Sequence, residues 1–265
     1  MSVMHMNFTS RSLTQKMDLW VVYPTPTLQD MIQHKDAYDA TRQWPVVYML
    51  HGAGGDGFEW VQRADVEAWC CKYGFIAVMP SCQLSFYNDT PDGRNFATYV
   101  AWELPNMIEA TFHASRQAKD RYLMGYSMGG FGAVRIGLCN PDRYHKLASL
   151  SGCMDVAGFI NAFEGGSIFR IHGALAGWPD IQGSDNDTLA LLDRAAARKA
   201  RRISSMHTAK NGVKKPRPWG WISSIPKGMG SMISPIGTPA SSRRYSPSSL
   251  KADRRCWAAG ERAAL

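Results

Sequence analysis

The chain has 265 residues, of which 45% are hydrophobic and 20% are charged. This composition is typical of a globular protein and excludes a collagen, a coiled coil or a wholly disordered chain. The formal net charge of +8 is divided unequally, because residues 1–193 carry −6 and residues 194–265 carry +14. A basic protein usually suggests a nucleic acid or an anionic membrane as a partner. Here we instead expect an acidic globular body followed by a basic tail.

The six cysteines show neither a CxxC pair nor the density of a disulfide scaffold, so we expect free thiols and a cytoplasmic location. No apolar run approaches the roughly 20 residues of a membrane span. Residues 1–9 lack the charged and then apolar pattern of a secretory signal. No His, Cys or carboxylate cluster has the spacing of metal ligands, so we predict no metal and no cofactor.

Short apolar runs alternate with helical patterns along the first three quarters of the chain. Strands are predicted where β-rich runs end at turn residues, at 17–23, 45–50, 75–79, 121–124 and 147–150. Helices are predicted at 59–73, 98–112 and 128–139. This alternation indicates an α/β fold, with a mostly parallel central sheet and helices on both faces.

The segment Gly125-Tyr126-Ser127-Met128-Gly129-Gly130 lies between a predicted strand and a predicted helix. This is the setting of a nucleophile elbow, in which glycines permit a sharp turn and leave the serine hydroxyl exposed at a helix N-terminus. Ser127 is therefore our candidate nucleophile. The alternative is a glycine-rich turn with an ordinary serine.

A second glycine-rich loop, His51-Gly52-Ala53-Gly54-Gly55-Asp56, follows the predicted strand 45–50. An α/β-hydrolase supplies its second oxyanion donor from this position. We predict that the backbone N–H groups of Ala53 and Met128 form the oxyanion hole. A phosphate-binding loop is the alternative, but neither a G-K-[ST] nor a G-x-G-x-x-G signature is present.

From about Tyr48 to Gly152 the chain resembles the esterase D-like putative esterase family. The resemblance rests on YMLHGAGGDGFEW, ADVE, FIAVMPS, SFYNDTPDG, ELPNMIEATF, DRYLMGYSMGGFGAVRIGL and LASLSG. Tributyrin and acetyl esterases belong to this family, and S-formylglutathione hydrolase and feruloyl esterases are its relatives. The resemblance implies an α/β-hydrolase fold and a serine esterase that acts on short acyl esters.

The same resemblance implies roles for individual residues. Ser127 matches the family's nucleophile, and Ala53 and Met128 match its oxyanion donors. Further matches lie near the acyl pocket, at Trp60, Ser85, Phe86 and Tyr87. Among these we select Trp60 and Tyr87 as substrate-binding candidates, with simple packing as the alternative.

The acid and base of a catalytic triad are not evident in the C-terminal part. The order Ser, Asp, His is expected in this fold, yet Asp253 is the only aspartate after Asp193 and His207 is the only histidine after His172. Asp185, Asp187 or Asp193 could in principle serve as the acid of the triad, with His207 as its base. No recognisable motif surrounds any of these residues. His51 belongs to the oxyanion loop, and we expect structural or exposed positions for His113, His145 and His172.

The genetic code suggests why these residues are missing. Trp and Met each have a single codon, so the third base of that codon is known. A shifted reading frame takes the third base of one codon and the first two bases of the next, and it is therefore partly known after each Trp and Met. In that frame Trp219–Gly220 and Met229–Gly230 encode Gly, and Trp221–Ile222 and Met232–Ile233 encode Asp. Elsewhere the third bases are not fixed, and the shifted frame permits an E-D-F-L-D segment across 201–206. It also permits a G-V-H-D-F loop whose histidine codon spans Ser231–Met232. The third reading frame takes the last two bases of one codon and the first base of the next, and it has a stop codon at Met232–Ile233. We hypothesise that the chain leaves its ancestral frame near residues 194–201.

We therefore expect an α/β-hydrolase core at 1–195, incomplete at its C-terminus, and a basic Ser/Arg/Pro-rich tail at 196–265 that is disordered or out of frame. The expected activity is hydrolysis of a small-molecule acetyl-type ester through an acyl-enzyme, impaired by loss of the C-terminal Asp and His. We expect no nucleic-acid and no membrane partner. The alternatives are an acyltransferase of the same fold and a non-catalytic protein whose basic tail binds anions.

Overall fold

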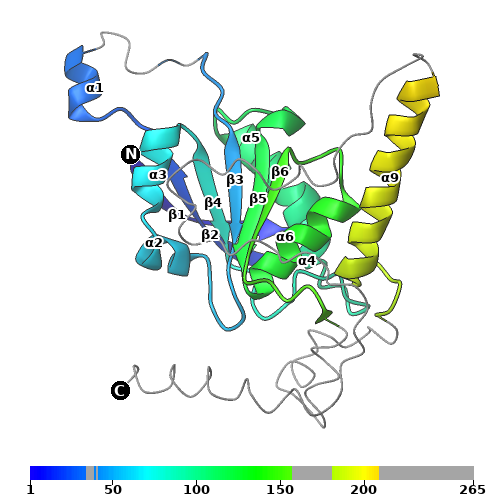
Figure 1. Cartoon of the computed structure of the whole chain (residues 1–265). Helices are drawn as coiled ribbons and strands as arrows, with labels where there is room; N and C mark the ends of the chain where they lie inside the picture. The colour runs from blue at the N-terminus through cyan, green and yellow to red at the C-terminus, as the bar shows by residue number, and fades with distance from the viewer. Residues whose placement is uncertain (34–38, 40, 157–180, 209–265) are drawn as a thin grey trace, which may run out of the picture. The chain divides into compact units, whose positions relative to one another are not determined.

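The computed structural model describes residues 1–33, 39, 41–156 and 181–208, with side chains up to residue 198 (Figure 1). All of them belong to one compact unit, Met1–Met232. The strands are β1 Ser2–Ser10, β2 Gln15–Tyr23, β3 Val46–Leu50, β4 Ile76–Pro80, β5 Arg121–Tyr126 and β6 Lys146–Leu150. The α-helices are α1 Leu28–Gln33, α2 Phe58–Arg63, α3 Val66–Tyr73, α4 Phe96–Thr98, α5 Leu104–Thr111, α6 Met128–Cys139 and α9 Thr188–Thr208. A π-helix, η1, spans Tyr99–Glu103, and a 3-10 turn, η2, spans Ala118–Asp120.

The strands form a mixed six-stranded sheet in the order β1-β2-β4-β3-β5-β6. Strands β4, β3, β5 and β6 run parallel to one another, while β2 pairs antiparallel with both β1 and β4. The predicted mostly parallel sheet is confirmed. All five predicted strands are present, whereas β1 was not predicted.

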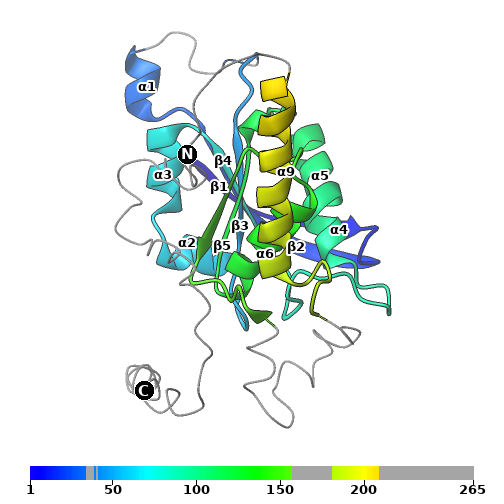
Figure 2. The same cartoon turned by 45° about the vertical axis from the view of Figure 1, so that its right-hand side comes forward.

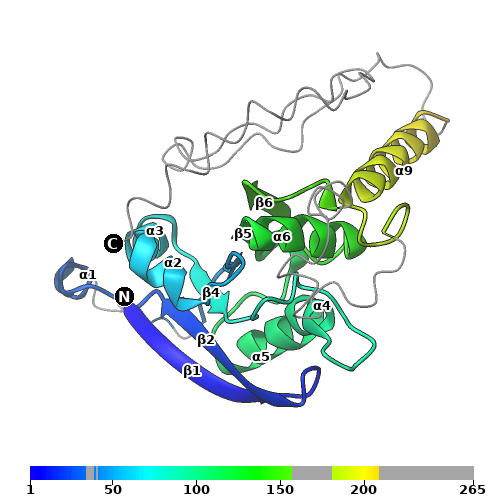
Figure 3. The same cartoon turned by 90° about the horizontal axis from the view of Figure 1, so that it is seen from below.

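Helices cover both faces of the sheet because alternate residues of each strand point to opposite sides. On β3, Tyr48 packs into a core with α5 and α6, and Met49 packs into a second core with α2 and α3. Figure 3 shows these two pairs of helices on opposite faces of the sheet. The expected two-faced α/β architecture is therefore confirmed.

The predicted helix 59–73 is wrong as a single element. Ala64 adopts an extended conformation, with φ −131° and ψ 150°, and its N–H closes α2 on the carbonyl of Trp60. The chain then starts α3 at Val66. The change of direction allows both Trp60 and Cys70 to reach the same core. The predicted helix 98–112 is present as η1 and α5, and helix 128–139 matches α6.

Helix α9 continues through residue 195, where we expected the hydrolase core to end, and extends to Thr208. It packs against α6 (Figure 2). The expected boundary therefore falls inside a helix. The rest of the predicted tail, from residue 209 on, lies outside the described residues. In the described part of the chain, no helix is long and apolar enough to cross a membrane.

Candidate active site

The candidate residues lie in loops that leave one edge of the sheet. Because β3, β4, β5 and β6 are parallel, their carboxyl ends meet at this edge, and the register pairs Leu50 with Gly125. Strained backbone also gathers here. Of the six described non-glycine residues with positive φ, five lie in the loops after β4, β5 and β6, namely Gln83, Phe86, Tyr87, Ser127 and Ser151. Such strain persists where surrounding contacts hold it and often marks a functional site.

Ser127 occupies the sharp turn between β5 and α6. Its φ of 51° and ψ of −119° reverse the chain within one residue. Its N–H donates to the carbonyl of Leu150 at 2.8 Å, which anchors the turn to the end of β6. The residue is exposed, and its hydroxyl has no hydrogen-bond partner among the residues with described side chains. The predicted strand–turn–helix context is therefore confirmed.

Two glycines of the motif are required by close packing. A Cβ on Gly125 would lie 2.3 Å from the carbonyl oxygen of Gly129, and a Cβ on Gly129 would lie 2.3 Å from the carbonyl oxygen of Leu50. Helix α6 consequently begins in contact with the end of β3. This contact brings the loop of His51 and Ala53 next to the turn of Ser127.

Within the described residues, the backbone N–H groups of the two predicted oxyanion donors have no hydrogen-bond acceptor. Met128 is the first residue of α6, and Ala53 lies in the exposed part of the loop after β3. Neither backbone N–H donates a hydrogen bond to another described residue. The Met128 amide lies at a helix N-terminus, where the helix dipole is positive, and such an amide suits the stabilisation of a developing oxyanion.

His51 holds the oxyanion loop in place and is not available as a base. Its Nε2 accepts a hydrogen bond from the N–H of Cys82 at 2.8 Å, so the proton resides on Nδ1, which donates to the carbonyl of Gly52 at 2.7 Å. The side chain is fully buried, and burial lowers the pKa of the imidazole. The structure thus agrees with the expectation that His51 is part of the loop.

Tyr87 and Trp60 are both buried in this structure. The Tyr87 hydroxyl donates to the carbonyl of His51 at 2.8 Å, and its ring packs against Gly132 of α6. Trp60 is 6% exposed and makes an edge-to-face contact with Tyr126. Ser85 and Phe86 are also buried. These contacts are those of packing side chains, and a role in substrate binding stays a prediction.

One pair beside the loop was not predicted. The hydroxyl of Tyr126, the residue before Ser127, donates to the carboxylate of Glu59 on α2. Glu59 also forms an ion pair with Arg63 at 3.2 Å. The Tyr126 ring fills the space beside Gly52, where a Cβ would lie 2.5 Å from it. Position x of a G-x-S-x-G motif carries no signal for such a contact.

Two of the three substitute acidic residues, Asp185 and Asp187, have local structural partners. Asp187 accepts hydrogen bonds from the N–H groups of Gly183 and Ala190, which lower the pKa of its carboxyl. Asp185 forms an ion pair with Arg194 at 3.0 Å. The side chain of His207 lies outside the described residues, as does all of His172.

Two further histidines, His113 and His145, contact residues outside the loops that carry Ser127 and Ala53. The His145 ring packs edge-to-face on Tyr122, and the carbonyl of His113 accepts a hydrogen bond from the N–H of Trp44. Among the described residues, no group of three or more His, Cys, Asp or Glu side chains could hold a metal ion.

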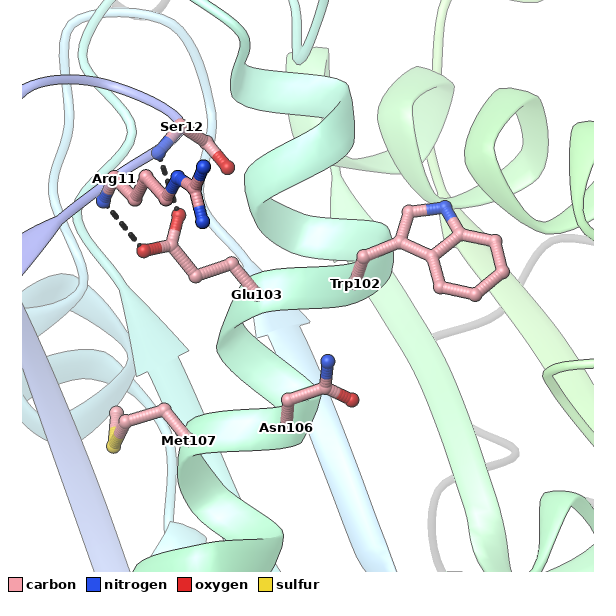
Figure 4. A pocket seen from close by; sticks show the side chains of 6 residues that line it. All are labelled: Arg11, Ser12, Trp102, Glu103, Asn106 and Met107. Carbon is pink, nitrogen blue, oxygen red and sulfur yellow. Dashed lines mark hydrogen bonds between the residues drawn. The ribbon is translucent and has the colours of Figure 1, made fainter.

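An open depression of about 470 Å³ lies elsewhere, beside the β1–β2 turn (Figure 4). It is lined by Arg11, Ser12, Trp102, Glu103, Asn106 and Met107. None of these residues belongs to the loops that carry Ser127 or Ala53. The depression is therefore separate from the candidate active site.

The model of the family described as "Putative esterase" matches residues 31–227. The chain belongs to this esterase family. The match includes Ala53 and Ser127 and continues beyond residue 195.

Individual relatives of this esterase agree with the family. The acetyl esterase of Caldicellulosiruptor saccharolyticus is 26% identical over 203 residues, which cover 73% of this chain and 74% of the relative. The S-formylglutathione hydrolase of Paracoccus denitrificans is 26% identical over 129 residues, which cover 40% of this chain and 46% of the relative.

Solved structures support the fold. The S-formylglutathione hydrolase of Staphylococcus aureus has a TM-score of 0.62 at 20% identity and covers 75% of each chain. The fluorophosphonate-binding serine hydrolase F of the same organism has a TM-score of 0.64 at 18% identity, covering 79% of this chain and 87% of its own. The α/β-hydrolase fold predicted for this esterase is confirmed.

Proposed function

We propose that the protein is a serine carboxylic ester hydrolase that acts on small-molecule esters with short, acetyl-type acyl groups. The observation that carries the proposal is Ser127, which is exposed on a strained turn at the N-terminus of α6. Beside it lie two amides that donate to no other residue in the described part of the chain. Membership of the esterase family and the similarity to an acetyl esterase support the ester and the acyl group.

In this proposal the Ser127 hydroxyl attacks the acyl carbonyl, and the N–H groups of Ala53 and Met128 stabilise the resulting oxyanion. The tetrahedral intermediate expels the alcohol and leaves an acyl-serine. Water then attacks the acyl-serine and releases the carboxylic acid. A base must take the serine proton in the first step and give it to the departing alkoxide, and in the second step take the water proton and return it to Ser127.

We propose that this base is missing from the chain as written, because the gene departs from its ancestral frame near residues 194–201. The forced Gly and Asp codons across 219–233 support the proposal, as does the lack of a histidine partner at Ser127 among the described side chains. A triad without its histidine retains only about 10³–10⁴-fold acceleration over water. We accordingly propose the basic tail at 196–265 as a product of the changed frame.

The test compares p-nitrophenyl acetate hydrolysis by this chain, by Ser127→Ala and by a frame-restored version of the gene. We expect weak hydrolysis that Ser127→Ala lowers further, and a rate higher by orders of magnitude in the restored version. Equal rates for the chain and Ser127→Ala, together with an inactive restored version, would overturn the hydrolase proposal. Resequencing tests the frame: bases that encode no histidine across Ser231–Met232 would exclude it.

We also propose a cytoplasmic location. The described cysteines are all free thiols, namely Cys70, Cys71, Cys82, Cys139 and Cys153, which suits a reducing compartment. Cell fractionation with an antibody against the chain tests this, and recovery in a secreted or membrane fraction would contradict it.

A further inference from the structure

Arg135 is a buried cation in α6 that the proposed chemistry does not use. It is 8% exposed, and no carboxylate of the described residues lies within ion-pair distance of it. Burial lowers the pKa of its guanidinium, which means that the charged form is held at a cost. A buried charge that is paired only with neutral groups requires a structural or functional reason.

The guanidinium joins two loops to α6. Its Nη1 donates to the carbonyl of Tyr87 at 3.2 Å, and its Nη2 donates to the side-chain oxygen of Asn88 at 3.1 Å. Its Nε donates to the side-chain oxygen of Asn186 at 2.6 Å. The planar fork of an arginine places donors on three separate nitrogen atoms, whereas the three donors of a lysine share one nitrogen and cannot reach acceptors spread in this way.

The loop held by Arg135 has a strained conformation. Phe86 and Tyr87 have φ values of 48° and 52°, in the region that non-glycine residues rarely adopt. The hydroxyl of Ser85 accepts a hydrogen bond from the N–H of Tyr87 at 3.1 Å, which helps to form the turn. Strain of this kind persists only when neighbouring contacts over-determine the backbone, and Arg135 supplies two of those contacts.

The loop in turn reaches the candidate oxyanion hole. The Tyr87 hydroxyl donates to the carbonyl of His51, and the His51 ring donates to the carbonyl of Gly52, next to Ala53. Arg135 lies on α6, the helix that begins directly after Ser127. One rigid element therefore carries the candidate nucleophile at its start and, through Tyr87, anchors the loop that supplies the second oxyanion donor.

We infer that Arg135 is a positioning residue, which sets the Ala53 amide relative to Ser127 through Tyr87 and His51. The catalytic part of this inference rests on the proposed function, whereas the mechanical part does not. The proposed chain of contacts runs from Arg135 to Tyr87 and from Tyr87 to His51, so substitutions at its two steps should have different effects. Removal of the guanidinium should release both the loop 81–88 and the loop 51–55, while removal of the Tyr87 hydroxyl should release only 51–55.

The test is hydrogen–deuterium exchange with Arg135→Met, Arg135→Lys and Tyr87→Phe. The methionine keeps an unbranched chain without donors, and the lysine keeps the charge without the fork. The control is Ile136→Ala, which empties a core position next in sequence and touches neither loop by a hydrogen bond. Its cavity should lower protection throughout the sheet and not selectively at the two loops.

We expect Arg135→Met to speed exchange about tenfold in peptides covering 81–88 and 51–55, with β5 unchanged. Arg135→Lys should give a smaller effect of the same pattern, and it replaces the methionine variant if that variant does not fold. Tyr87→Phe should speed exchange at 51–55 alone. Unchanged loops in the Arg135 variants, or uniform exchange like that of Ile136→Ala, would overturn the inference.

A second experiment measures kcat and KM for p-nitrophenyl acetate hydrolysis by the frame-restored chain with and without Arg135→Met. Because a displaced oxyanion donor affects the transition state more than substrate binding, kcat should fall about tenfold in Arg135→Met with KM within about twofold. A rise in KM with kcat unchanged would contradict the positioning role. If no version of the chain hydrolyses the ester, the proposed function fails, while the exchange experiment still decides whether Arg135 orders the two loops.

Discussion

The carbonyl oxygen of Leu50 occupies the space beside Gly129, 2.3 Å from where a Cβ would lie. The end of β3 and the first turn of α6 are thus in backbone contact, which places the loop of Ala53 beside Ser127. Helix propensity alone would favour alanine over glycine by about 1 kcal/mol in a helix. At position 129, however, the contact with Leu50 makes replacement of the glycine by alanine unfavourable.

Gly129→Ala should lower the free energy of unfolding by about 2 kcal/mol or more, since the methyl group must displace backbone atoms. Urea denaturation measures the effect. Gly93→Ala is the matched control, because Gly93 has a φ of 89° but no atom within 4 Å of a Cβ. It should cost about 1 kcal/mol from backbone strain alone. Equal costs for the two variants would show that the contact with Leu50 is not decisive.

Substitutions at Ser127 should separate strain from chemistry. Both Ser127→Ala and Ser127→Gly remove the hydroxyl, but only glycine adopts a φ of 51° and ψ of −119° without strain. We expect the glycine variant to be more stable than the alanine variant by about 1 kcal/mol, while both lose the candidate nucleophile. Thermal denaturation of the three proteins checks this order. A less stable glycine variant would indicate that the turn is not strained.

The buried His51 should make stability depend on pH. Burial lowers its folded-state pKa below the ordinary value near 6.5, so the unfolded chain binds the proton more readily. Its contribution is complete above pH 6.5 and is lost as the pH falls toward the folded-state pKa. The free energy of unfolding should fall by at most about 1.4 kcal/mol per pH unit in that range.

Denaturation of the wild type and His51→Gln at pH 5, 6, 7 and 8 measures this dependence. The variant should be less stable at pH 7, since it loses the paired contacts to Cys82 and Gly52. Its stability should also change less between pH 7 and pH 5. Identical slopes in the two proteins would assign the pH dependence to other groups.

Glu103 should anchor the turn between β1 and β2. Its carboxylate accepts hydrogen bonds from the N–H groups of Arg11 at 2.6 Å and Ser12 at 2.9 Å (Figure 4). It also accepts one from the Ser10 hydroxyl at 2.8 Å. Burial raises the pKa of this carboxyl, but the hydrogen bonds outweigh burial and lower it overall. The ionised form therefore stabilises the fold above the unfolded-state pKa near 4.5, and this contribution is lost as the pH falls through the lower folded-state pKa.

Glu103→Gln should lower the free energy of unfolding by about 1 kcal/mol at pH 7, a small value because the group is partly exposed. The loss should disappear at a pH below the folded-state pKa. Glu67→Gln, on the exposed side of α3, matches the change in charge and should be nearly neutral. An equal effect of both variants would mean that net charge, and not the turn, explains the result.

Much of the fold could be predicted because its signals are local. The strand before Ser127 and helix 128–139 follow from a short apolar run, a glycine-rich turn and a helical pattern ended by Asn140-Pro141. Strand β1 was not predicted, although Met4, Met6 and Phe8 alternate with exposed residues. The predicted helix 59–73 is wrong because the break at Ala64 depends on packing against the core and has no glycine or proline to mark it.

The sequence by itself determined the turn that presents Ser127, the amides that flank it and the α/β order of the elements. Backbone geometry decides these features within a few residues, so a local pattern is sufficient. Only the tertiary structure decided what His51, Tyr87, Glu59 and Arg135 do, since each acts through a hydrogen bond to a residue far away in the chain. A buried polar group takes whichever partner the packed strands and helices bring to it, and the spacing of residues along the chain does not encode that partner.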